Sequence, residues 1–252
     1  MMKNFIKAYW KTLLFFGLGG LVGGYFTGIY LLDSYPSDIR QEVLSQGLTE
    51  TLLGLITAVQ SAGYGVALGA LGILLGKATG LWKDERTLAP KPLLITAMAA
   101  VIGGLALILP DLLFFGRYSQ AIMDSYAVKP TVPYILAAVT YGAVIEEVML
   151  RLFFMSLIAF VLYKLFGKKG ERPALWILIT SNIVAATLFA AGHLPATLMI
   201  GSSPMILFRC FLLNGGFGLL FGRLYRKYGL RYAMIAHGGC HVVSKLIWLL
   251  FV

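Results

Sequence analysis

The chain has 252 residues, of which 59% are hydrophobic and only 13% are charged. Soluble globular chains carry about 25% charged residues, so this composition excludes a water-soluble domain and indicates an integral membrane protein. The formal net charge is +10, but the basic residues form short clusters between apolar runs instead of one stripe. That distribution is typical of membrane topology signals and argues against a nucleic-acid partner.

About 20 apolar residues cross the core of a bilayer as a helix, and the chain contains seven such runs. They are predicted at residues 10–32, 52–76, 92–115, 133–163, 173–195, 205–223 and 230–252. The runs are continuous, whereas the strands of a transmembrane barrel alternate polar and apolar residues. We therefore expect an all-α fold, a polytopic transmembrane helix bundle of about seven spans that forms a single integral membrane domain over residues 1–252.

The distribution of Lys and Arg predicts the orientation of this bundle. Most of the 21 basic residues lie in the N-terminal segment and in the loops around residues 77–91, 164–172 and 223–231, all on one side. The loops on the other side hold only Arg40, Arg117 and Lys129. Because positive loops stay inside, the sequence predicts a multi-pass protein of the cell membrane with a cytoplasmic N-terminus and an outer C-terminus.

Glycines in the first two spans recur at four-residue spacing, as in Gly20, Gly24 and Gly28. Small residues at this spacing let membrane helices approach closely, so we expect these spans to pack against neighbouring helices. The segment from Asp33 to Glu50 is acidic and amphipathic, and is predicted to lie at the outer surface as a short helix.

Ionisable groups inside membrane spans are costly unless they are paired or face a wet cavity, so they are functional candidates. In the last four spans these residues are Glu146, Glu147, Arg151, His193, Arg209, His237, His241 and Lys245. All three histidines of the chain are in this set.

The two adjacent glutamates are predicted to play different parts. On an α-helix, Glu147 and Arg151 lie one turn apart on the same face and can pair. Glu146 lies about 100° around the helix and is left free to point elsewhere. It is therefore a candidate general base for a water molecule. The alternative is a charge cluster that only ties two helices together.

His237 and His241 stand four residues apart, so both rings project from one face of the last span. Two histidines at this spacing, joined by His193 and a glutamate pair, indicate a functional site more than a packing role. Gly238 and Gly239 lie beside that face, where the lack of side chains could let a peptide backbone approach closely.

Three motifs occur in order on separate spans: Glu146-Glu147-x-x-x-Arg151, Phe189-x-x-x-His193 and His237-x-x-x-His241. This set resembles the CPBP family of intramembrane proteases, the CAAX-protease and bacteriocin-processing group also called Abi proteins. The motif-bearing core covers about residues 133–252. The resemblance implies that Glu146 and His193 hold and activate the attacking water. It further implies that Glu147 and Arg151 support the site, and that His237 and His241 stabilise the oxyanion.

His241 departs from the family pattern, which has Asn or Asp at this position. An imidazole can also donate a hydrogen bond to an oxyanion, so activity can survive the change. Alternatively, Glu146, His193, His237 and His241 would supply the ligands that zinc accepts, as in a metalloprotease. Loss of activity is the third possibility. The cofactor is therefore either none or zinc.

His193 and His237 lie at different distances along their helices from the basic residues that mark the inner membrane surface. At about 1.5 Å per residue, His237 lies about 9 Å beyond Arg231, whereas His193 lies roughly 30 Å beyond Arg172. The two histidines meet only if the fourth and fifth helices project past the inner membrane surface. We therefore predict a helical hairpin around residues 155–180 that stands into the cytoplasm.

The predicted function is an endopeptidase that hydrolyses a peptide bond of a membrane-associated or lipid-linked protein or peptide. Its partners would be membrane lipid and a peptide or membrane-protein substrate. The main alternative is a non-catalytic membrane regulator or immunity protein of the same fold that binds a partner, an interpretation that His241 favours. A proton-coupled transporter also uses glutamate and histidine relays, but the chain shows no repeat halves with paired broken helices.

Overall fold

The computed structural model describes residues 2–84, 87–168 and 170–252, and within these ranges it contains helices and no β-strand. Six long helices are α1 (Met2–Ser34), α3 (Glu50–Thr79), α4 (Pro90–Leu113), α8 (Leu175–Gly192), α10 (Pro204–Tyr228) and α11 (Leu230–Phe251). A further continuous helical run comprises α6 (Val132–Ala137), η2 (Ala138–Met155) and α7 (Ser156–Phe166). Seven segments of the described chain are long and apolar enough to span a membrane, which confirms the all-α, multi-pass prediction.

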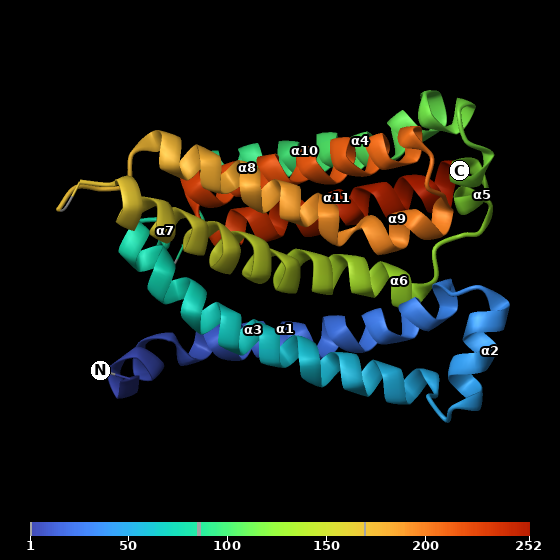
Figure 1. Ribbon diagram of the computed structural model, residues 1–252, viewed down its shortest axis with the longest axis horizontal. Coiled ribbons are helices and arrows are strands. Elements are labelled where there is room, and N and C mark those ends of the chain that lie inside the picture. The colour runs from blue at the N-terminus through green and yellow to red at the C-terminus, as the bar shows by residue number, and fades with distance from the viewer. Residues whose placement is uncertain (1, 85–86, 169) are drawn as a thin grey trace.

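The long helices run side by side along the longest axis of the molecule (Figure 1). The N-terminus lies at the same end as the α7–α8 connection, whereas α2 (Ser37–Ser45), α5 (Gln120–Ala127) and the C-terminus lie at the opposite end. Lys83 Nζ donates a hydrogen bond to the Lys227 carbonyl at 3.0 Å, so two of the predicted basic loops meet. Which end faces the cytoplasm stays a prediction.

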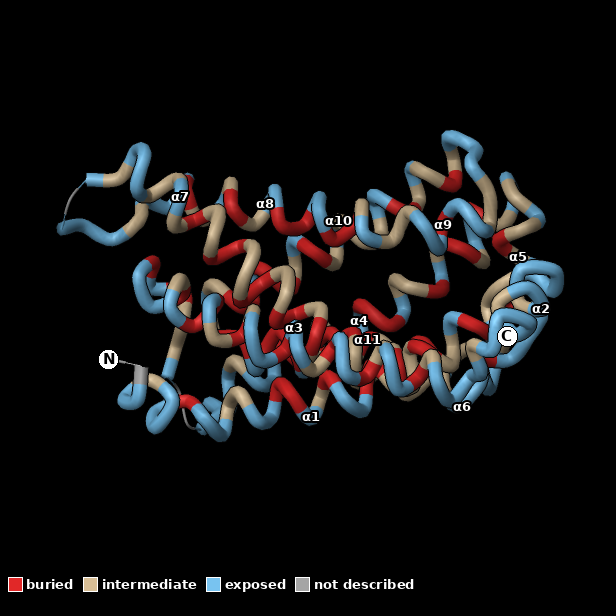
Figure 2. Tube along the Cα trace, turned by 60° about the horizontal axis from the view of Figure 1, so that its bottom comes forward, coloured by how far each residue is buried: buried red, intermediate tan, exposed pale blue. Residues whose placement is uncertain are grey.

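The surface of the bundle is apolar, as expected for a protein surrounded by lipid. Buried residues follow the inward faces of the helices (Figure 2). Large apolar side chains on the outside include Leu94, Ile102 and Leu250, which are 63%, 62% and 70% exposed. Soluble monomers rarely expose contiguous apolar surface on this scale, so these faces indicate contact with lipid.

The glycine repeat of α1 packs directly against the main chain of α3. A methyl group added at Gly24 or Gly28 would come within 2.5 Å of a carbonyl oxygen of α3, that of Thr57 or Leu53 respectively. One added at Gly20 would come within 2.6 Å of the α3 main chain. The predicted close packing of these glycines is therefore confirmed. The short helix predicted between Asp33 and Glu50 is α2.

The fourth span differs from an ordinary α-helix. Its central segment η2 is π-helical, with hydrogen bonds that skip one residue more than in an α-helix. Such wide turns are rare and occur frequently at functional sites. This segment carries Glu146, Glu147 and Arg151, so the α-helical spacing assumed from the sequence does not apply to them.

The fifth span ends earlier than predicted. Helix α8 stops at Gly192, His193 caps it, and a separate short helix α9 (Leu194–Ile200) follows. Pro195 explains the break, because proline lacks an N–H donor and disfavours helical geometry at the residue before it. His193 therefore sits at a helix junction rather than inside a continuous helix.

The predicted hairpin around residues 155–180 corresponds to α7 and α8, which extend to the end of the molecule that holds the N-terminus (Figure 1). Tyr163 Oη donates a hydrogen bond to the Glu171 carbonyl at 2.7 Å and so ties α7 to the connection. Its projection into the cytoplasm stays a prediction.

Candidate active site

Glu147 is the centre of the buried polar network. Its carboxylate is 0% exposed, and Oε1 accepts a hydrogen bond of 2.8 Å from His237 Nδ1. The same oxygen lies 3.4 Å from Arg151 Nη1, so the predicted Glu147–Arg151 pair is confirmed. A carboxylate oxygen only accepts, so Nδ1 of His237 carries the proton and Nε2 is the acceptor in the neutral ring. Glu147 thus sets the tautomer and orientation of His237, a contact that the sequence did not predict.

Aromatic rings enclose this network. The Arg151 guanidinium is 4.4 Å from the centre of the Phe189 ring and 5.5 Å from that of Phe221. Phe221 also stacks on His237, with ring centres 4.6 Å apart and an angle of 19° between the planes. Among the described residues, Glu147 Oε2 and both Nη atoms of Arg151 have no hydrogen-bond partner. The network is therefore desolvated but only partly satisfied.

Glu146 approaches the other nitrogen of the same imidazole. Its side chain is 24% exposed, and its Oε2 lies 3.8 Å from His237 Nε2. Among the described residues no hydrogen bond or ion pair joins Glu146 to Arg151, as expected, but both glutamates of η2 approach His237, Glu147 at Nδ1 and Glu146 at Nε2. A separation of 3.8 Å is too long for a direct hydrogen bond but allows one water to bridge the two atoms.

Gly142 contributes to the site in a way that the sequence analysis missed. A methyl group added at Gly142 would lie 3.3 Å from His237 Nε2 and 3.5 Å from His241 Nε2. The outer nitrogens of both rings therefore face the bare main chain of η2. Gly142 precedes Glu146 by four residues, and this G-x-x-x-E-E spacing was the available signal.

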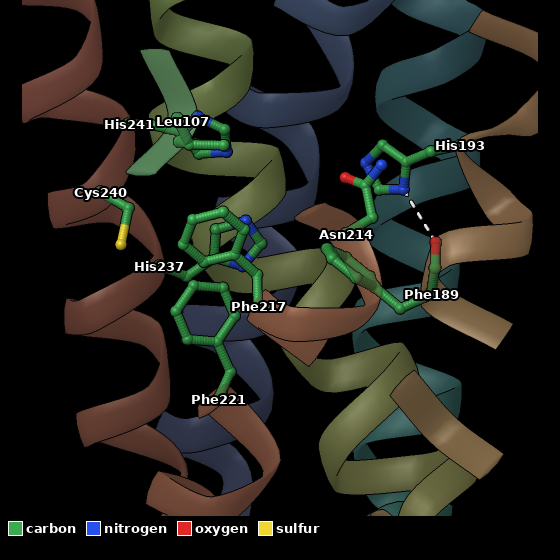
Figure 3. A pocket seen from close by; sticks show the side chains of 9 residues that line it. All are labelled: Leu107, Phe189, His193, Asn214, Phe217, Phe221, His237, Cys240 and His241. Atoms are coloured by element: carbon green, nitrogen blue, oxygen red, sulfur yellow. Dashed lines mark hydrogen bonds between the residues drawn. The ribbon is translucent and has the colours of Figure 1, made fainter. Parts of the chain in front are cut away.

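The three histidines meet at one cavity of about 30 Å³ (Figure 3). Its lining comes from α4, α8, α10, α11 and the α8–α9 junction: Leu107, Phe189, His193, Asn214, Phe217, Phe221, His237, Cys240 and His241. A water molecule needs at least about 10–15 Å³ of such volume, so the cavity has room for one or two. His237 connects it to both glutamates.

One hydrogen bond fixes the orientation of His193 in the cavity wall. Its Nδ1 donates a hydrogen bond of 2.8 Å to the Phe189 carbonyl, one turn earlier. A carbonyl only accepts, so the neutral His193 ring presents Nε2 as an acceptor. Both His193 and Glu146 lie in the described part of the chain, and no hydrogen bond or ion pair joins them. His237, not His193, is the histidine beside Glu146.

The four side chains considered for zinc do not form a ligand set in this arrangement. Within residues 2–84, 87–168 and 170–252, no group of three or more His, Cys, Asp or Glu side chains is placed to hold a metal ion. The residues therefore do not fit the zinc site that Glu146, His193, His237 and His241 would make.

The remaining ionisable candidates lie away from the cavity. Arg209 Nε and Nη2 donate to the two carboxylate oxygens of Asp111, and Tyr126 Oη donates to Asp111 Oδ2 at 2.8 Å. We call these three residues the Asp111 cluster. Lys245 Nζ donates to Tyr134 Oη at 2.8 Å and lies 4.1 Å from the centre of that ring. These contacts account for both basic residues without a catalytic role.

A multi-pass helix bundle whose cavity holds three histidines, one of them backed by two glutamates, has the groups that acid–base hydrolysis requires. Residues 128–243 match the family model described as Rce1-like: Type II CAAX prenyl endopeptidase Rce1-like. The match spans all six predicted site residues and confirms the resemblance to the CPBP family. Comparisons with curated proteins and with solved structures gave no match.

Proposed function

We propose that this protein is an intramembrane endopeptidase that hydrolyses a peptide bond of a membrane-associated or lipid-linked protein or peptide. The similarity of residues 128–243 to type II CAAX prenyl endopeptidases supports this class of activity. The single observation that carries the mechanism is the approach of Glu146 Oε2 to His237 Nε2 at 3.8 Å, beside the cavity.

In the proposed mechanism, a water molecule lies between Glu146 and His237. Glu146 accepts one proton of this water, and the hydroxide adds to the carbonyl carbon of the peptide bond. Glu146 then gives the proton to the leaving amine, so that the C–N bond breaks and the products are a carboxylic acid and an amine, with Glu146 again ionised. The Glu147 contact holds His237 in one tautomer throughout.

The oxyanion formed on the carbonyl oxygen needs hydrogen-bond donors in a place without bulk water. His241 lines the cavity beside His237 and is the candidate donor, through a ring nitrogen that carries a proton. This assignment modifies the one that the family resemblance implied, because His237 faces Glu146 whereas His193 does not.

The proposed substrate is lipid-linked because the site lies within the apolar spans and much of its lining is apolar or aromatic. A peptide carried on a lipid chain would be concentrated at the membrane and could enter between helices or from the cytoplasmic end. We place the protein in the cell membrane with its N-terminus in the cytoplasm, as the distribution of basic loops predicts.

The test uses the purified protein in detergent with a prenylated peptide that ends in a CAAX sequence, and with the same peptide lacking the prenyl group. Mass spectrometry of the products should show one cleaved bond in the prenylated peptide and slower cleavage of the other. Treatment with a chelator should leave the rate unchanged. Intact peptides after incubation with the folded protein would overturn the proposal and favour a non-catalytic regulator.

A further inference from the structure

One polar side chain of the cavity has no part in the mechanism above. Asn214 lies in the middle of α10, a half-buried amide in a membrane-spanning helix. Figure 3 shows Asn214 on the same side of the cavity as His193, across from His241. Polar residues in such a position cost free energy unless they have a partner or a function.

The hydrogen bonds of Asn214 fix the direction of its amide. Nδ2 donates to the Cys210 carbonyl, one turn earlier, at 3.0 Å and contacts Cys210 Sγ at 3.6 Å. The amide nitrogen is thereby turned to its own helix, and Oδ1 points into the space between the two walls (Figure 3). In the described part of the chain, no group donates a hydrogen bond to Oδ1. The cavity therefore contains a fixed acceptor with both lone pairs available.

The chemistry of a peptide substrate requires such an acceptor. Each main-chain N–H group that enters an apolar cavity loses its hydrogen bonds to water and needs a new partner. Around Asn214 the wall consists largely of aromatic rings, those of Phe189, Phe217 and Phe221, which offer no comparable acceptor. His193 Nε2 is the other acceptor on this side.

We propose that Asn214 is a substrate-positioning residue whose Oδ1 accepts a hydrogen bond from a main-chain N–H group next to the scissile bond. This contact fixes the register of the peptide, so that its carbonyl lies between the His193 side of the cavity and His237. The inference rests on the proposed peptidase function and adds the residue that would select the peptide backbone.

The first experiment measures binding separately from cleavage. A prenylated CAAX peptide is titrated into Glu146→Gln protein, which retains the cavity but lacks the general base, with and without Asn214→Leu. Loss of one hydrogen bond should weaken the Kd about fivefold to tenfold. With Glu146 intact, Asn214→Leu should raise KM more than it lowers kcat. The control is Thr187→Val, which removes an exposed hydroxyl that bonds to its own helix outside the cavity, and it should leave the Kd unchanged.

The second experiment identifies the bonded group. Peptides in which single N–H groups are replaced by N-methyl are compared, and one position should weaken binding to the Asn214 protein but not to the Asn214→Leu protein. Asn214→Met is the second variant if the leucine variant fails to fold. Cleavage by the wild type with an equal Kd and an equal N-methyl profile in both proteins would overturn the role of Asn214 alone. A wild type that neither binds nor cleaves the peptide would overturn the peptidase proposal itself.

Discussion

Two buried charged clusters in this bundle are built from similar residues but differ in how completely they are satisfied. In the Asp111 cluster, both carboxylate oxygens accept hydrogen bonds from Arg209, and Tyr126 adds another. In the Glu147 network, Glu147 Oε2 and the Arg151 Nη atoms have no hydrogen-bond partner among the described residues. Fully satisfied networks rigidify a fold, whereas underpaired groups are kept where function needs them. The difference is the one expected if the Asp111 cluster is structural and the Glu147 network belongs to the proposed active site.

Tyr126 supports this distinction. Burial raises the pKa of its phenol far above the ordinary value, and the neighbouring Asp111 carboxylate raises that pKa further. Tyr126 therefore stays protonated and keeps donating to Asp111 throughout the physiological pH range. The Asp111 cluster thus has the properties of a constant tie between α4, α5 and α10.

The largest expected effect on stability is that of Asp111→Ala. The change leaves Arg209 as an unpaired, mostly buried charge and should lower the free energy of unfolding by about 3–5 kcal/mol. The double variant Asp111→Leu with Arg209→Met should recover most of the loss, because it removes both charges. Arg151→Ala should lower the free energy of unfolding by less than Asp111→Ala does, since Glu147 keeps its hydrogen bond to His237. Denaturant titration in detergent measures the free energy of unfolding of each variant. An Asp111→Ala protein as stable as the wild type would contradict the structural role of the Asp111 cluster.

An intermediate effect is expected for Gly142→Ala. The added methyl group would lie 3.3 Å from Nε2 of His237, so that ring must shift by a few tenths of an ångström, whereas its 3.5 Å approach to Nε2 of His241 is an ordinary van der Waals contact. Small displacements of catalytic groups are costly, and we expect the rate of peptide cleavage to fall by about tenfold or more. Gly216→Ala is the matched control, because a methyl group there meets nothing within 4 Å. Equal rates of peptide cleavage by the two variants would contradict a role for Gly142 in positioning the histidines.

The smallest effect is expected for His241→Asn, which restores the residue of the family pattern. An amide N–H can occupy much the same place as an imidazole N–H, so most of the cleavage activity should remain. Metal analysis of the purified wild type and the variant accompanies the rate measurement. Stoichiometric zinc in the wild type, lost together with activity in the variant, would contradict a metal-free role for His241.

The sequence predicted those features that follow from apolar length and from the cost of buried charge. Seven spans, the Glu147–Arg151 contact and the meeting of the three histidines all depend on these two rules. The direction of Glu146 depends on the π-helical turn of η2, for which the residue pattern gave no rule. Asp111 was visible within the predicted third span, but nothing in the sequence identified Arg209 as its partner.

Uncharged residues of the site escaped the same reasoning. Gly142 and Asn214 carry no charge, so a search for costly ionisable groups passes over both. Their placement depends on tertiary packing: Gly142 faces two histidine rings of α11, and Asn214 reaches the cavity from α10. The break at His193 was predictable in part, because Pro195 follows it by two residues.

In the proposed function Glu146 acts as the general base, while the stability of the fold depends on other groups. The most direct test is the rate of cleavage of a prenylated CAAX peptide per folded molecule of Glu146→Gln, with the melting temperature measured in the same sample. Glu42→Gln, in the exposed helix α2, is the control. We predict a loss of about 10²–10⁴-fold at Glu146 with an unchanged melting temperature, and no loss at Glu42. Cleavage by Glu146→Gln at the wild-type rate would contradict the account.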